Sequence, residues 1–443
     1  MNTSTSTNEQ LNKLIEFRQA VYEQGFTQRR DAQFELLDAL LLAGPISSFA
    51  ELSQRPVFRR TWPSLYAAVE DGGQDPAWIE PYLVSQLPRT GTLVLPLDGS
   101  AWPRPQSPTL PDRQYVYSPT AAGSRPVVGE AYSLLTWVAE PHSSWVLPLS
   151  VERIPSGSGA VQVGIQQIQA VCQHLQAQAN PAEVVIAADG KYGNHHFLGP
   201  LRGSACQVVV RLRKDRVLYR PPEPYAGNGR PAIHGTRFAF KEPETWGPPT
   251  QQTQFDHPRW GKVELCLWSD LHALADAHTP FAVIRARVHL ERPNPPEPLW
   301  LGWQGARLPV STIWGYYEQR ASIEASIKER KQQLHWTQPQ LRTPAAIERW
   351  TRLVSLAQWA LFLARSLVLD KPLPWQPAQQ RLTPGRVQLG LGALFTQIGS
   401  PAQAPQTRGK SPGWPKGQSR ARPQRHQVVK KGKKPPGKRR KAA

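Results

Sequence analysis

The stretch TLVLPLDGS at residues 92–100 and its counterpart EVVIAADG at residues 183–190 decide the fold. Each is a short apolar run that ends in Asp-Gly, at Asp98 and at Asp189. An apolar run of this length, bounded by turn residues, is typical of a buried strand. The sequence between them adds further strand patterns and one helical pattern at residues 159–179, so we predict a mixed α/β unit.

The rest of the chain divides by composition and periodicity. Residues 1–88 have helical spacing, with Ser48 and Glu51 placed as in a capping box, and predict a small helical domain. Residues 89–213 hold the α/β unit, and the Pro-rich residues 214–302 predict a β-rich insertion. Residues 303–342 and 343–399 are expected to return to helix, with a continuous helix from 309 to 333. The tail at 400–443 is low-complexity and expected to be disordered.

Charge is concentrated at one end of the chain. The net charge is +20, and residues 401–443 carry 14 of the Lys and Arg residues with no Asp or Glu. Such a tail indicates contact with nucleic acid, or a solvated segment without a specific partner. The three cysteines are far apart in sequence and indicate neither a disulfide framework nor a zinc site, which is typical of a reducing cytoplasm. No signal peptide and no membrane span are expected.

Asp98 and Asp189 share one setting, at the mouth of a buried strand, where α/β sheets place their ligands. Two carboxylates held side by side repel each other unless a cation neutralises them, and Mg²⁺ prefers carboxylate and water oxygens. The alternative is that each Asp-Gly is only a turn.

A third carboxylate lies in YEQRASIEASIKERK. Here Tyr317, Arg320, Glu324 and Lys331 are separated by three, four and seven residues, so on one continuous helix they share a stripe. The alternative is a solvated face on which Arg320 pairs with Glu324.

The spacing Tyr317-x2-Arg320-x3-Glu324-x6-Lys331 resembles the Y-x2-R-x3-E-x6-K signature of one group of bacterial DDE transposases of insertion sequences. In that group two aspartates follow strands of an RNase H-like fold, as Asp98 and Asp189 do here, and a β-rich insertion precedes the Glu. The resemblance therefore implies an RNase H-like mixed sheet flanked by helices, with a DNA-binding domain at 1–88 and a possible dimerisation region at 343–399.

The resemblance also implies the chemistry. Asp98, Asp189 and Glu324 would hold two Mg²⁺ ions, with Mn²⁺ as a substitute, for cleavage and joining of DNA strands. Tyr317, Arg320 and Lys331 would bind phosphates of the transposon end. Trp300 would stack on a flipped base, since Pro298-Leu299-Trp300-Leu301 is similar to the family's pattern. The alternative for Trp300 is a core position, and Trp303 competes for the same role.

Several other residues are weaker candidates. Asp112 is an alternative first carboxylate in a turn-like context, His195 and His196 are expected to be loop residues, and Arg104 and Arg113 are hypothetical phosphate contacts.

The expected partners are double-stranded DNA, as transposon ends and target, and a second copy of the chain on paired ends. Neither a membrane nor an organic cofactor is expected, and the place of action would be the bacterial cytoplasm, at the nucleoid. Two other functions remain open: a catalytically inactive transposase-derived DNA-binding protein, and a basic RNA-binding protein that works through its tail.

Overall fold

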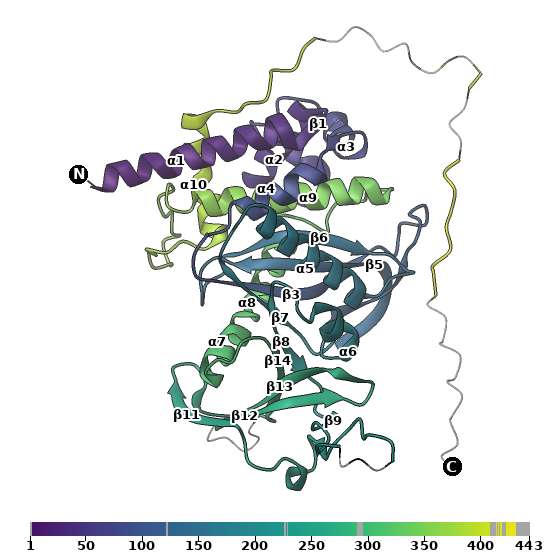
Figure 1. Cartoon of the computed structure of the whole chain (residues 1–443). Coiled ribbons are helices and arrows are strands. Elements are labelled where there is room, and N and C mark those ends of the chain that lie inside the picture. The colour runs from purple at the N-terminus through teal and green to yellow at the C-terminus, as the bar shows by residue number, and fades with distance from the viewer. Residues whose placement is uncertain are drawn as a thin grey trace.

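The computed structural model has one large mixed sheet, helices on both of its faces and a helical unit at one end (Figure 1). It describes residues 2–120, 123–225, 227, 229–289, 296–407, 413, 415, 417, 418 and 422–430. The mixed α/β class predicted from the sequence is confirmed.

Six strands form the core of the sheet: β3 (Thr92–Pro103), β4 (Gln114–Thr120), β5 (Gly123–Val138), β6 (Val146–Ile154), β7 (Glu183–Ala188) and β8 (Gln207–Leu212). β3 pairs in parallel with β7, and β7 pairs in parallel with β8. On its other side β3 pairs antiparallel with the long strand β5, which also carries β4 and β6. The apolar run of β3 suits this place because both faces of the sheet are covered here, so successive side chains are buried on either face.

Six more strands come from the predicted β-rich segment: β9 (Val217–Tyr219), β10 (Arg237–Ala239), β11 (Gln251–His257), β12 (Gly261–Ala273), β13 (Asp276–His289) and β14 (Leu299–Gln304). A short 3₁₀ turn, η4 (Pro243–Thr245), lies between β10 and β11. β14 pairs antiparallel with β8, with Trp303 opposite Val209, so these strands extend the central sheet instead of forming a separate one. The core and the insertion are therefore one continuous hydrogen-bonded sheet.

Each face of the core sheet has its own helix. α5 (Ala160–Ala177) packs on the face that carries Leu95 and Leu97, and α7 (Val310–Gln319) packs on the face that carries Val94 and Val185. The alternation of side chains along a strand separates these two sets. After β7 the chain forms the short α6 (His195–Leu198) and η3 (Gly199–Leu201) before it enters β8.

The helical unit draws on both ends of the chain. Its members are α1 (Asn2–Ala20), η1 (Val21–Gly25), β1 (Phe26–Gln28), α2 (Arg30–Leu41), η2 (Phe49–Gln54), α3 (Trp62–Glu70), β2 (Gly73–Gln74), α4 (Pro76–Ser85), α9 (Pro344–Ala364) and α10 (Pro384–Ile398). The predicted capping box of Ser48 and Glu51 starts η2. Trp350 of α9 packs edge-on against Phe49, with ring centroids 5.1 Å apart. The segments predicted as separate domains at 1–88 and 343–399 are therefore packed together.

Two described parts of the basic tail contact the folded body. Ala402 and Gln403 accept hydrogen bonds from Arg59 and Arg60 through their carbonyl oxygens. Residues 422–430 lie beside the start of β4, where Val429 bridges to Gln114. Disorder was predicted for the whole of 400–443; residues 422–430 instead have a defined place, and much of the rest lies outside the described residues.

Within the part of the chain that the structure describes, no helix is both long and apolar enough to cross a membrane. The three cysteines are free thiols. The thiol of Cys172 on α5 meets that of Cys206 beside β8, and their hydrogen bond raises the pKa of Cys172.

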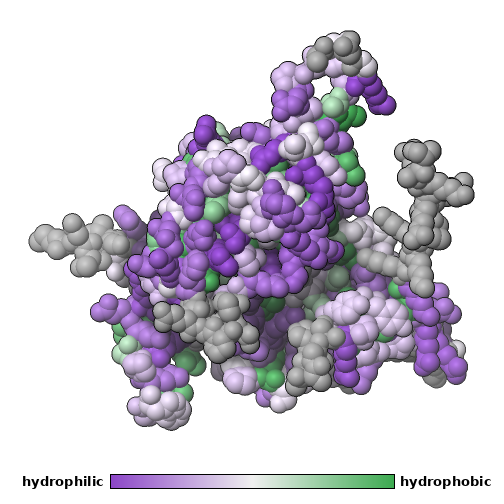
Figure 2. Space-filling view, turned by 90° about the horizontal axis from the view of Figure 1, so that it is seen from below, coloured by the Kyte–Doolittle hydropathy of each residue, from purple (hydrophilic) through white to green (hydrophobic). Residues whose placement is uncertain are grey.

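The face at the insertion end is mainly hydrophilic, with hydrophobic residues scattered over it (Figure 2). In the insertion, the large hydrophobic side chains that the structure describes as exposed are Tyr225, Ile233 and Leu274. A surface of this kind suits a polar partner better than an apolar one.

Candidate active site

The structure brings Asp98 and Asp189 to neighbouring positions on the sheet. Leu97 of β3 pairs with Ala188 of β7 in parallel register, so the next residue on each strand is an aspartate. Adjacent strands are about 4.8 Å apart, and residues paired in register point to the same face. The two aspartates therefore lie side by side on the sheet face that α7 covers.

The prediction that Asp98 ends its strand is wrong. β3 continues to Pro103 because β5 keeps pairing with it, with Asp98 opposite Leu134 and Pro103 opposite Gly129. Only the pairing with β7 stops at Leu97. Asp98 is therefore the first residue of β3 that is paired with β5 but no longer with β7.

The turn interpretation of Asp-Gly holds at Asp189, which precedes the turn after β7, but not at Asp98, which lies within β3. At both residues a backbone N–H occupies only one oxygen of the carboxylate. Oδ1 of Asp98 accepts the backbone N–H of Gly99 at 2.7 Å, and Oδ1 of Asp189 accepts that of Lys191 at 3.0 Å. Each second oxygen stays available for another partner. The local backbone contact and a ligand site are therefore compatible at both residues.

Arg320 supplies that partner for Asp98. Its Nη2 lies 2.7 Å from Oδ2 of Asp98, and its Nη1 lies 3.8 Å from Oε1 of Glu324. The side chains of Asp98 and Arg320 are 19% and 15% exposed, whereas that of Glu324 is 70% exposed. One guanidinium thus bridges the first and third predicted carboxylates, and the predicted Arg320–Glu324 pairing is its weaker half.

Burial raises the pKa of Asp98 above its ordinary value, and the Arg320 guanidinium opposes this shift. The negative charges of Asp189 and Glu324 add to the increase, which places all three carboxylates within electrostatic range of one another. A cation at this point would lower the free energy of the ionised cluster.

The continuous helix predicted for 309–333 is interrupted. α7 ends at Gln319 and α8 (Ser322–Gln332) begins after Ala321. Here the backbone bonds reach back only three residues, from Arg320 to Tyr317 and from Glu324 to Ala321. This tight turn has about three residues per turn, so the single stripe expected for an unbroken α-helix is lost.

The two remaining signature residues, Tyr317 and Lys331, differ in how close they lie to the carboxylates. Tyr317 is near the carboxylates: burial raises the pKa of its phenol, and the charges of Arg320, Arg211, Asp189 and Asp98 act on it. Lys331 is partly buried near the end of α8, and burial lowers the pKa of its ammonium group. Of the charged signature residues, Arg320 and Glu324 therefore join the aspartates most directly.

Arg211 was missed from the sequence. Val210 of β8 pairs with Ala188 of β7, so Arg211 is the in-register neighbour of Asp189, as Asp189 is of Asp98. The row Arg211–Asp189–Asp98 thus crosses three parallel strands on one face. Arg211 and Asp189 are equally far along β8 and β7 from the paired residues Gln207 and Val185. This match could have identified Arg211, but it can be recognised only when the pairing of the strands is known.

Trp300 does not fit the predicted base-stacking role. Along β14, Leu301 and Trp303 point to the face that α7 covers, so Trp300 points to the opposite face from the aspartates. It is 5% exposed and stacks on Phe240 with ring centroids 4.1 Å apart. The core alternative is the better description, and Trp303 is also buried, with its indole N–H bonded to Ala306.

The weaker candidates have structural partners. Asp112 pairs with Arg153 at 2.8 Å and accepts hydrogen bonds from Ser156, which makes it a turn residue. The guanidinium of Arg104 is buried and donates to the carbonyls of Pro339 and Leu341, so the hypothesis that it contacts phosphate is wrong. Arg113 is buried as well.

His195 and His196 begin the short α6. Burial, and after it the neighbouring His196, lowers the pKa of His195. Nothing places either imidazole with the carboxylates.

The donor set at Asp98, Asp189 and Glu324 consists of carboxylate oxygens, the ligands that hard divalent cations prefer. Among the described residues, no three His, Cys, Asp or Glu side chains are close enough together to hold a metal ion. Two of the three predicted ligands are adjacent, and the exposed Glu324 side chain must turn toward them to complete the set. The residues therefore suit a divalent cation in type, but in the described structure only Asp98 and Asp189 are adjacent.

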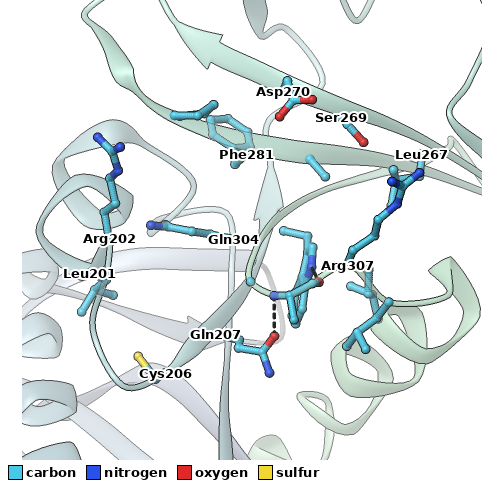
Figure 3. A pocket seen from close by; sticks show the side chains of 18 of the residues that line it. Leu201, Arg202, Cys206, Gln207, Leu267, Ser269, Asp270, Phe281, Gln304 and Arg307 are labelled. Carbon is cyan, nitrogen blue, oxygen red and sulfur yellow. Dashed lines mark hydrogen bonds between the residues drawn. The ribbon is translucent and has the colours of Figure 1, made fainter.

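A cavity of about 1100 Å³ lies elsewhere, between the core and the insertion (Figure 3). Glu183 and Gln207, which begin β7 and β8, line it, so it opens at the opposite ends of the strands from Asp189 and Arg211. Arg202 and Arg307 extend from its walls, and Gln207 accepts the backbone N–H of Ala306 at 2.8 Å. Of the candidates named from the sequence, Trp303, the alternative to Trp300, lines this cavity, whereas the three carboxylates and the signature residues do not.

Comparison with known proteins identifies a family. A family model described as DDE superfamily endonuclease matches residues 21–272. The match includes Asp98 and Asp189 and ends before Glu324. No curated protein matches the chain.

Proposed function

This chain belongs to the DDE superfamily of endonucleases, and from that premise we propose that it is a transposase that cuts and joins DNA at the ends of an insertion sequence. Its substrate would be double-stranded DNA, and its reaction would be metal-dependent strand cleavage followed by strand transfer.

The adjacency of Asp98 and Asp189 carries the proposal. Two aspartates in register on parallel strands, each with one oxygen that no backbone N–H occupies, would supply two of the ligands of a divalent-cation site. Glu324, near the start of α8, faces the same guanidinium as Asp98, and its exposed side chain would turn toward the aspartates to complete the set. The proposed ligands are therefore Asp98, Asp189 and Glu324, for two Mg²⁺ ions or for Mn²⁺ in their place.

When bound, the ions supply an activated water or 3′-hydroxyl and a Lewis acid for the leaving oxygen. The chain's own part is positioning and charge. Arg320 can bind a phosphate through two parallel N–H donors. In the absence of DNA one of its nitrogens, Nη2, bonds to Asp98. Tyr317 and Arg211 lie beside the aspartates and would hold the phosphate on the α7 side. Lys331 would act further along α8 as a point charge.

The partners follow from the same proposal. The helical unit of α1–α4 and α9–α10 would contact the DNA flanking the cut, and two copies would act together on paired ends. The oligomeric state with and without DNA ends, measured by light scattering, tests the second statement. A monomer in both conditions would contradict it.

The decisive experiment is a cleavage assay on linear DNA that carries the ends of the protein's own element. We expect nicking at the element boundary with Mg²⁺ or Mn²⁺, none with EDTA, and none in the Asp189→Ala variant. The control is Asp215→Asn, which changes an exposed aspartate beyond the end of β8 and should cut as the wild type does. Cleavage that survives both Asp189→Ala and Glu324→Gln would exclude the proposed chemistry.

A second candidate is a DNA-binding protein without activity. The observation that favours it is the ion pair of Arg320 and Asp98, in which a guanidinium takes the place that a metal ion would need. Tight binding of the ends without cleavage in either metal would support this candidate.

A further inference from the structure

Residues 422–430, RPQRHQVVK, lie against the edge of the central sheet. The backbone N–H of His426 donates to the carbonyl of Pro108 at 2.8 Å, and that of Val429 donates to the carbonyl of Arg113 at 2.7 Å. Val429 forms a parallel bridge with Gln114, the first residue of β4. Contacts between main chains thus determine the position of the segment.

β4 is a place where an added strand is expected. Among the described strands it pairs only with β5, so its other edge presents backbone groups without strand partners. A free edge of this kind recruits extended segments, and main-chain hydrogen bonds supply the affinity. The tail segment uses this edge where β4 begins.

Side chains support the same arrangement. His426 and Val428 are partly buried, while Arg425, Gln427 and Val429 are exposed, which is the alternation of a strand. The guanidinium of Arg113 is buried beneath the segment and donates to the carbonyl of His426 at 3.0 Å. The body thus provides a specific donor for the segment's backbone, and the segment faces solvent with its basic side chains.

The location matters for the proposed active site. Gly129 of β5 pairs with both Gln114 of β4 and Pro103 of β3, and Pro103 lies five residues beyond Asp98 along β3. At roughly 3.3 Å per residue along a strand and about 4.8 Å between strands, the anchor lies on the order of 20 Å from Asp98. Residues 431–443 follow directly, with seven Lys and Arg and no acidic residue. At about 3.3 Å per residue they can span roughly 40 Å, enough to reach DNA that passes the carboxylates.

We propose that residues 422–430 are a docking strand for the β4 edge, and that they hold the basic residues 431–443 against DNA beside the active site. The DNA half of this inference rests on the proposed function; the docking half does not. Phosphate contacts from such residues are independent of sequence and weaken with salt.

The docking strand is the chain's own. Gln403 is held at the helical unit, where its backbone N–H donates to Asp31 at 2.8 Å. Residues 404–421 can extend to about 60 Å at roughly 3.3 Å per residue, which exceeds the size of a small domain. A second copy is therefore not needed to supply the strand.

Hydrogen exchange on the full chain without DNA tests the docking. We expect slow exchange at the amides of His426 and Val429, at a rate independent of protein concentration. Val429→Pro removes the N–H that bonds to Arg113, so the whole segment should exchange fast. Gln427→Pro is the matched control, because the amide of Gln427 makes no hydrogen bond among the described residues, and it should keep the protection. Fast exchange in the wild type would overturn the proposal, and protection that rises with concentration would assign the edge to the tail of a second copy.

Binding of DNA that carries the element's ends tests the second half. Val429→Pro keeps every charge but frees the tail, so we expect on the order of tenfold weaker binding, the loss of a modest tethering effect. Gln427→Pro should bind as the wild type does. Equal binding by Val429→Pro and the wild type would overturn the DNA half. Exchange protection in a wild type that neither binds nor cuts the ends would instead overturn the proposed function and leave the docking strand in place.

Discussion

At the scale of single residues, Arg320 occupies the position on which the chemistry depends. Its guanidinium bonds to the one oxygen of Asp98 that the backbone N–H of Gly99 leaves available, and it also faces Glu324. A divalent ion bound at the proposed site would compete with this guanidinium for the same carboxylate. DNA phosphate, which binds arginine through two donors, would shift the competition toward the ion.

We therefore expect Arg320→Ala to bind Mn²⁺ more tightly than the wild type in the absence of DNA. The gain should be on the order of tenfold, or about 1.4 kcal/mol, because a partly buried ion pair no longer has to be broken. Isothermal titration with Mn²⁺ measures it. Arg320→Lys, which keeps the charge, is the control, and unchanged affinity in Arg320→Ala would show that the ion pair does not limit metal binding.

A second residue-scale prediction concerns Glu152 on β6, which shares a cavity with Glu80 of α4. Burial and the neighbouring Glu80 raise the pKa of Glu152 to about 7. In the folded chain Glu152 therefore keeps its proton up to about pH 7, whereas in the unfolded chain it loses the proton near its ordinary pKa of 4.5. The contribution of Glu152 to the free energy of unfolding is therefore fully present below pH 4.5 and is lost as the pH rises toward 7.

Glu152→Gln imitates the protonated carboxyl and should remove this loss. We expect the variant to be more stable than the wild type at pH 8, by at most roughly 3 kcal/mol and less where solvent screens the pair, with little difference at pH 4. Urea unfolding at the two pH values measures it. Glu223→Gln, at an exposed position, should show no such dependence, and equal gains at both pH values would refute the assignment.

At the scale of elements, helix α5 determines where β3 lies. Gly164 of α5 faces Leu97, one residue before Asp98, and a Cβ there would come within 2.8 Å of Leu97 Cδ2 and 3.2 Å of Tyr192 Cε1. The helix can pack this closely only because the glycine has no side chain. The position of Asp98 on the sheet thus depends on a residue of a neighbouring helix.

Gly164→Val should therefore destabilise the chain by about 1–3 kcal/mol, the usual cost of overpacking, and should reduce cleavage in surviving folded protein. Thermal unfolding and the cleavage assay measure the two effects. Gly392→Ala in α10 is the control, because a Cβ at this position would have no neighbour within 4 Å, and the change should stabilise by roughly 0.5–1 kcal/mol. A Gly164→Val variant as stable as the wild type would show that α5 can move away freely.

The sequence predicted individual helices and strands better than it predicted how they pair with one another. The strand that became β7, the helix α5 and the capping box at Ser48 all follow from local patterns, because periodicity and caps act within one segment. The extension of β3 beyond Asp98 and the place of Arg211 depend on pairing with β5 and β7, which no local pattern records. The break at Arg320 was missed because the helical pattern continues unbroken through it.

At the scale of the whole molecule, the two ends of the chain depend on each other. α9 packs against α1, α2 and α3 and also against β6, and Arg349 donates to the backbone at Val69 and Glu70. The helices of residues 1–88 thus bury their apolar faces against α9, which lies more than 250 residues later in the chain.

Removal of residues 343–443 should therefore expose the apolar faces of α1–α3. We expect this variant to lose helical signal and to be cleaved rapidly by protease within residues 1–88. The control ends at residue 407, which keeps α9, α10 and the contacts of Ala402, and should resist protease as the full chain does. Protease resistance of residues 1–88 in the shorter variant would show that they fold by themselves.

The late arrival of α9 also sets an order for folding during synthesis. The strands from β3 to β14 leave the ribosome before α9 exists, so the sheet can pair while the first helices still lack their partner. At about 5–20 residues per second, the opening segment waits on the order of ten to sixty seconds for α9. During that interval its apolar helices are a natural target for chaperones, and a message cut short before residue 344 would yield a chain that quality control removes.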